Sequence, residues 1–480
     1  MQRPFYLKKH AGFIGVALIV LIFYALTFYA EKIEINEGLG YDGAAYAKIA
    51  KDFQTLFLKK EISPYRLHRV FPSAVIHYGL RLLNLPLDNA HILKGFEIYN
   101  LAILLISLFI WSKIAKSVRL TEKSRWFGYL LLFGSFAILK MNFYYPTLTD
   151  TTAFALGLGL LYFYIKESSL GILLMLFISF FTWPVAILNA VILYIFPKKI
   201  KAVRSRSRLM PKIIASGISL LYLLFFLYFH YLSGYGGGIA VNKGLLPFSV
   251  ASVLFYLFLM SYLLLRDIKM SSIFTVKNLS VIARRVIFIL LLFGVLSAAY
   301  SYFVRHPGTG ESTLFSIILY RIFITPVIRP LTFLLAHVVY FGPAIIIAAV
   351  FFDKISKLTK DWGIGITALL IANLSLAIFA ESRGSINIVP FVVFFVVLFI
   401  DRVKWDNRIY LGFMVISLIL SKVWLGLNAD LDFYKMNFGH RIPREWYVIQ
   451  GLFVSLCFAF CIIARFFYRE HTDDREEAGI

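Results

Sequence analysis

The run FIGVALIVLIFYALTFYA, residues 13–30, decides the fold class because none of its side chains is charged. A helix of this length nearly crosses the apolar core of a bilayer, which is about 30 Å thick. Similar runs recur along the 480-residue chain, which is 60% hydrophobic and only 16% charged. Backbone groups in lipid must be hydrogen-bonded internally, and these runs lack the alternation of barrel strands. We therefore predict an all-α polytopic membrane protein.

The remaining runs predict about 12–14 transmembrane helices in a single transmembrane domain, residues 1–480, without a soluble C-terminal domain. The net charge of +23 falls largely in short loops, a pattern that marks the cytoplasmic side rather than nucleic-acid binding. Both termini are thus expected in the cytoplasm and the protein in the cell membrane. The stretch of residues 170–196 is broken at Trp183–Pro184 and predicts two short helices that either span twice or re-enter.

A long polar segment, residues 31–94, follows the first span and is predicted to be extracytoplasmic, with an interfacial helix in SAVIHYGLRLLNLP. Its stretch GLGYDGAAYAKIAKDF holds Asp42 between a tyrosine and a glycine, and glycines free the backbone to turn the carboxylate toward a ligand. A simple Asp-Gly turn explains the pattern equally well. In PYRLHRVFP, Arg66 and Arg69 are predicted to share a helix face, either binding a phosphate or snorkelling toward anionic lipids.

Further charges fall on the same predicted side of the membrane. Asp150 ends YYPTLTD, where it could also be a helix N-cap, and Glu381 and Arg383 lie in AESRGSIN, where they could pair with each other. His306 lies in a later outer loop. Acids and arginines that share one face indicate a site for an anionic, phosphate-bearing substrate.

Three features form one pattern: the first-loop acid, the YR…R…P segment and the aromatic-Pro-…-Thr-Asp entry to a later span. This pattern resembles the GT-C superfamily of integral membrane glycosyltransferases. The similarity is to the polyprenyl-phosphate-sugar-dependent enzymes of the mannosyltransferase type, and it covers roughly residues 10–400. It implies a polyprenyl-phosphate-linked sugar as donor, membrane lipid as surroundings, and an acceptor that is a glycan, lipid or protein. Transfer would take place on the extracytoplasmic face with inversion.

The resemblance also implies roles for individual residues. Asp42 matches the family's first-loop acid, the general base that deprotonates the acceptor hydroxyl. Asp150 would be a second catalytic residue that orients a substrate or holds a divalent cation, Mg²⁺ or Mn²⁺. Arg66, Arg69 and Arg383 would bind the donor phosphate. Other expected substrate contacts are Tyr41, Tyr46, Tyr145, Glu381 and His306.

Two departures and two alternatives accompany this interpretation. Many members carry two adjacent acids in the first loop, whereas Tyr41 and Gly43 flank Asp42, which leaves metal dependence open. Many also carry a soluble C-terminal domain. A transporter or flippase of a lipid-linked or anionic substrate is the main alternative, and it predicts charges near the bilayer midplane and repeated halves. A non-catalytic assembly protein predicts that Asp42→Asn is silent.

Overall fold

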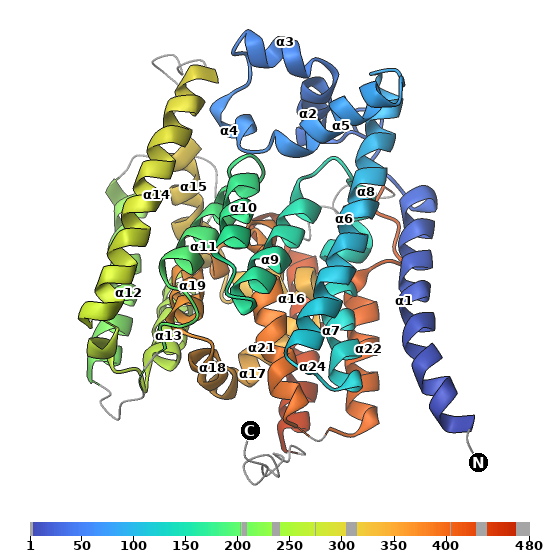
Figure 1. The fold of residues 1–480 in the computed structure, drawn as a ribbon. Coiled ribbons are helices and arrows are strands. Elements are labelled where there is room, and N and C mark those ends of the chain that lie inside the picture. Colours follow the sequence, from blue (N-terminus) through green and yellow to red (C-terminus); the bar gives the residue numbers. More distant parts are fainter. Residues whose placement is uncertain are drawn as a thin grey trace.

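The computed structural model describes residues 3–201, 203, 209–232, 241–273, 275–303, 314–403, 405–428 and 439–466. Within these ranges every regular element is a helix, and the longer helices run side by side in a bundle (Figure 1). The prediction of an all-α protein is confirmed.

The first half of the chain supplies both the small helices at one end of the bundle and several helices of its centre. These elements are α1 (Arg3–Tyr29), α2 (Tyr41–Lys51), α3 (Phe53–Leu58), α4 (Pro64–Leu67), α5 (Phe71–Leu82), α6 (Asn89–Ser117), α7 (Glu122–Phe133), the π-helix η1 (Ala137–Met141), α8 (Asn142–Tyr144), α9 (Asp150–Ile165), α10 (Ser169–Phe180), α11 (Pro184–Ile195), α12 (Leu209–Leu227) and the π-helix η2 (Tyr228–Leu232).

The second half completes the bundle. Its elements are α13 (Leu246–Leu265), η3 (Met270–Ser272), α14 (Val276–Phe303), α15 (Leu314–Ile324), η4 (Thr325–Val327), α16 (Thr332–Phe341), α17 (Pro343–Val350), α18 (Phe352–Asp361), α19 (Ile364–Ala372), α20 (Leu374–Ala377), η5 (Ser382–Ser385), α21 (Val389–Asp401), α22 (Asn407–Ser421), η6 (Gly439–Arg441) and α24 (Arg444–Phe466).

Five helices of the described chain are long and apolar enough to cross a membrane, or up to seven if each of two bent pairs is one span. Other apolar runs form helices of only 10–17 residues. Proline and glycine cause two of the breaks: Pro184 starts α11, and Gly342, at φ +76°, separates α16 from α17. The chain is thus a multi-pass helical membrane protein, the two helices around Trp183–Pro184 are confirmed, and the number of 12–14 spans stays a prediction.

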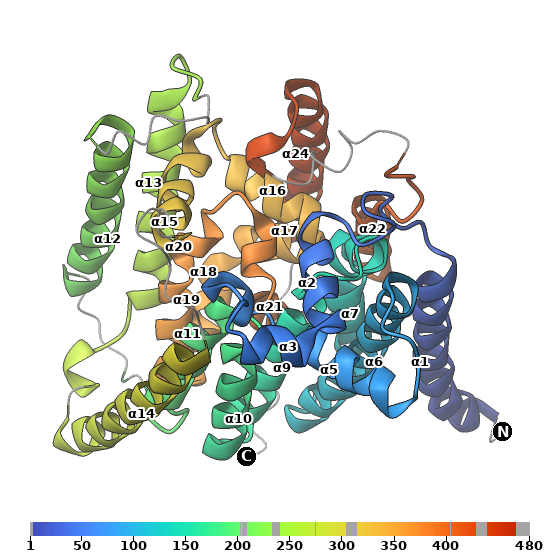
Figure 2. The ribbon, with the colours of Figure 1, turned by 90° about the horizontal axis from the view of Figure 1, so that it is seen from above.

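Helices α2 to α5 lie together at one end of the bundle, at the top of Figure 1, and in the view from above they lie over part of it, in front of α9 (Figure 2). The first residues of α1 and the last of α24 lie at the opposite end (Figure 1). The interfacial segment forms the helix α5, whose buried Ile76 and Leu80 pack with Ile92 and Phe96 of α6. That the α2–α5 end is extracytoplasmic stays a prediction.

The shared helix face expected for Arg66 and Arg69 is wrong. Helix α4 ends at Leu67, and Arg69 lies in the turn that follows, where its N–H donates to the Arg66 carbonyl. The next residues are tied to the end of α10, because the Phe71 N–H donates to the Phe181 carbonyl at 2.9 Å. This turn carries Arg69 toward the bundle instead of along the surface of a helix.

Helix α9 runs through the core and presents its first residue to η5. Nearly every side chain of α9 is buried. A Cβ at Gly157 would lie 2.2 Å from the Asn387 carbonyl oxygen, so the backbones of α9 and of the segment before α21 meet closely there. This contact sets Asp150, at the start of α9, beside Arg383 of η5.

Candidate functional site

Tyr145 holds the first turn of α2, which carries Asp42. The Tyr145 Oη accepts the backbone N–H of Asp42 at 2.8 Å and that of Gly43 at 3.3 Å. Gly40 lies against the Tyr145 ring at φ +70°, where a Cβ would come within 2.3 Å of the ring. The Asp42 carboxylate is half-buried and makes no hydrogen bond or ion pair with any described residue. Asp42 is therefore fixed through its backbone while its side chain stays available.

Asp150 forms a two-point ion pair with Arg383. Arg383 Nε and Nη2 donate to Asp150 Oδ1 and Oδ2 at 3.0 and 3.1 Å, and both residues are buried. Paired N–H donors match the two oxygens of a carboxylate, so the geometry holds both side chains in place. The N-cap of α9 is Thr149 rather than Asp150. The alternative of a Glu381–Arg383 pair is wrong, since the partner of Arg383 is a residue far away in the sequence.

Arg69 is a half-buried residue whose guanidinium lies against two aromatic rings. Its guanidinium carbon lies 4.8 Å from the ring centre of Tyr65 and 4.7 Å from that of Trp183. No carboxylate of the described residues pairs with it, and its Nε is buried without a hydrogen-bond partner. Burial lowers the pKa of Arg69, but Tyr46 and Tyr65 outweigh burial and raise it above its ordinary value, so the guanidinium stays charged.

Tyr46 links this cation to the rest of the site. Its Oη is buried without a hydrogen-bond partner, and burial raises its pKa while the charge on Arg69 acts in the opposite direction. Asp42 and Arg383 also act electrostatically on Tyr46, so each of them lies near this tyrosine. Trp183 Nε1 is likewise buried and unpaired. Buried polar groups are normally hydrogen-bonded, so three unpaired ones around Arg69 indicate a ligand or water that brings acceptor atoms.

The other residues expected in the site lie at its edge or outside the described residues. Tyr41 is 60% exposed. Arg66 and Glu381 are half-buried, and neither side chain has a hydrogen bond or ion pair within the described chain. His306 lies outside the described residues.

Tyr65 and Trp183 are contacts of Arg69 that sequence reasoning missed. In the sequence, Trp183 indicates only a helix break before a proline. An aromatic residue beside that break was the one available signal that its ring could meet a cation.

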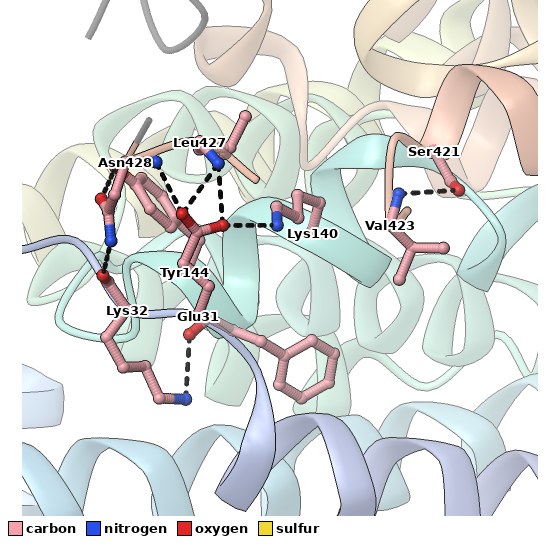
Figure 3. A network of polar contacts seen from close by, with 9 residues as sticks. Glu31, Lys32, Lys140, Tyr144, Ser421, Val423, Leu427 and Asn428 are labelled. Carbon is pink, nitrogen blue, oxygen red and sulfur yellow. Dashed lines mark hydrogen bonds and ion pairs between the residues drawn. The ribbon is translucent and has the colours of Figure 1, made fainter. Parts of the chain in front are cut away.

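A network of hydrogen bonds and ion pairs links chain segments next to Tyr145 (Figure 3). The Glu31 carboxylate accepts the backbone N–H groups of Leu427 and Asn428 at 2.8 and 2.6 Å and pairs with Lys140 at 2.9 Å. The Tyr144 Oη donates to the Asn428 side chain at 2.8 Å. Burial raises the pKa of Glu31, but these N–H donors and Lys140 outweigh burial and leave it below the ordinary value. The network joins three distant segments next to Tyr145.

Among the described residues, no group of three or more His, Cys, Asp or Glu side chains is placed to hold a metal ion. Comparison of the chain with protein-family models, curated proteins and solved structures finds no match. The functional argument therefore rests on the geometry of the site.

Proposed function

We propose that this protein is an integral membrane glycosyltransferase that moves a sugar from a polyprenyl-phosphate donor to an acceptor hydroxyl, with inversion, on the extracytoplasmic face. The observation that carries the proposal concerns two groups of opposite charge, the Asp42 carboxylate and the Arg69 guanidinium. Neither the Asp42 carboxylate nor the Arg69 guanidinium forms an ion pair with a described residue, and both act electrostatically on Tyr46. A base and a cation that both lie near Tyr46 suit a reaction that removes a proton and releases an anion.

The steps follow from these two groups. Asp42 takes the proton of the acceptor hydroxyl, and the acceptor oxygen attacks the anomeric carbon from the face opposite the phosphate. The bond between that carbon and the phosphate oxygen breaks, and the phosphate leaves with the electron pair. Arg69 balances the charge that develops on the phosphate, assisted by Arg66 at the edge of the site. The aromatic rings beside Arg69 keep it in place and limit the access of water.

Asp150 and Arg383 act by positioning in this proposal. Their ion pair occupies both carboxylate oxygens of Asp150, so Asp42 is the better general base. Arg383 acts electrostatically on both Tyr46 and Tyr145, and its charge therefore reaches the substrate region. A divalent cation, Mg²⁺ or Mn²⁺, is a separate part of the proposal, and transfer measured with and without a chelator tests it.

The deciding experiment is transfer of radiolabelled sugar from a panel of polyprenyl-phosphate donors in membranes. We expect Asp42→Asn to lower transfer about 10²–10⁴-fold, the usual contribution of a general base. Asp52→Asn is the matched control, because Asp52 is an exposed acid that follows the same helix α2. Equal transfer by the Asp42 variant and wild type would remove Asp42 from the chemistry. No transfer from any donor by folded wild-type protein would overturn the proposal and favour transport of an anionic lipid.

A further inference from the structure

We infer that Tyr145 contacts the substrate as a hydrogen-bond donor only, giving its phenolic O–H to an oxygen of the bound donor molecule. This inference deepens the proposed function and rests on it. It assigns a specificity-determining role to a side chain whose hydrogen bonds are all with the backbone of α2. The acceptor is a hydroxyl oxygen of the sugar or an oxygen of the phosphate.

The first step is the count of hydrogen-bonding positions on the phenol. A tyrosine hydroxyl has one proton to donate and lone pairs that accept. Two N–H groups, from Asp42 and Gly43, already donate to the Tyr145 oxygen. No described residue accepts the Tyr145 proton, because every contact that this hydroxyl makes is one in which it accepts. The one position left on the group is therefore its O–H.

The second step is the place and stability of this O–H. Gly40 packs on the ring so closely that a Cβ there would clash, which keeps the phenol from swinging away. The charged groups that face it are Asp42 of α2 and Arg383 of η5. Burial is the main cause that raises the pKa of Tyr145 to about 12, so the proton remains on the oxygen at physiological pH. The free proton thus lies beside the proposed base.

The consequence is a requirement on the substrate. A group that can only donate a hydrogen bond stabilises an oxygen lone pair of the substrate. It makes no hydrogen bond to a hydrogen or methyl group at the same place. Sites built to hydrogen-bond one substrate atom reject analogues that lack it. The donor molecule must therefore place an acceptor oxygen near the anomeric carbon, on the side of Asp42.

The test begins with Tyr145→Phe, using the donor that supports transfer by wild type. We expect about a tenfold loss of kcat/KM, as for one lost hydrogen bond. Tyr78→Phe is the matched control, since Tyr78 is an exposed tyrosine of α5 whose hydroxyl has no partner in the described chain. Deoxy analogues of the donor sugar are then compared. If one analogue makes wild type and Tyr145→Phe equal, the sugar hydroxyl removed in that analogue is the contact.

A second variant separates a contact from a structural role. Fluorinated tyrosine at position 145 keeps the ring and the accepting lone pairs but loses its proton at lower pH. If no deoxy analogue makes wild type and Tyr145→Phe equal, the pH dependence of transfer decides. A shift of its alkaline limb to lower pH in the fluorotyrosine protein then assigns the contact to a phosphate oxygen. No cancellation together with an unmoved limb would overturn the inference, as would full activity of a folded Tyr145→Phe. Absence of transfer by wild type would instead remove the proposed function and this inference together.

Discussion

Replacing Asp150 with Asn removes the carboxylate that faces the buried Arg383 guanidinium, and we expect this to be one of the most destabilising changes at a polar position. The two hydrogen-bonded distances are 3.0 and 3.1 Å, and the residues are only 7% and 9% exposed. At 3 Å and an effective dielectric constant of about 20, the Coulomb attraction is about 5.5 kcal/mol. Breaking one partner of a buried pair costs about 3–5 kcal/mol, in agreement with that value.

A double-mutant cycle measures this pair directly. The free energy of unfolding of purified protein in mixed micelles is compared for Asp150→Asn, Arg383→Gln and the double variant, with Asp52→Asn as the exposed control. The double variant should lose less stability than the sum of the single variants, by about 1–3 kcal/mol. Strictly additive losses, or an Asp150→Asn protein as stable as the control, would refute the reasoning that the pair is buried and coupled.

Two further changes test the packing and the polar network. Gly43→Ala places a Cβ within 1.9 Å of Thr147 Oγ1 and should lower stability by about 1–3 kcal/mol, whereas Gly217→Ala meets nothing within 4 Å and should be neutral or stabilising. Similar melting temperatures for the two variants would contradict this contact. The lowered pKa of Glu31 means that its contribution to stability is present above its ordinary value of 4.5 and is lost as pH falls below it. Glu31→Gln should therefore lower stability at pH 7 and reduce the further loss on acidification to pH 4, and equal acid losses in both proteins would count against the network.

The fold class could be predicted from the sequence because long apolar runs allow few structures in lipid. The helix α5 and the break at Pro184 could also be predicted, since amphipathic periodicity and proline act locally, while the interfacial position of α5 stays a prediction. The length of each helix could not, because hydropathy gives one continuous run where Gly342, at φ +76°, divides the chain into α16 and α17.

The site could be predicted in its residue types but only in part in its pairings. Asp42, Arg69 and Arg383 each act electrostatically on Tyr46, and that they form one site stays a prediction. Spacing in the sequence predicted wrong neighbours. It predicted that Arg69 shares a helix face with Arg66, and it allowed Arg383 to pair with the nearby Glu381. Local spacing carries no information on which distant helices meet, and long-range contacts decide both cases.

The contacts of Glu31 with Leu427 and Asn428 can form only late in the synthesis of the protein. Glu31 is synthesised 397 residues before Asn428, whose N–H it binds. At about 5–20 residues per second, the glutamate waits about 20–80 s for that partner. Asp150 similarly waits for Arg383, which comes 233 residues later. Glu31 and Asp150 thus emerge early, while Asn428 and Arg383 lie in the last third of the chain, so neither contact can form until that third is being synthesised.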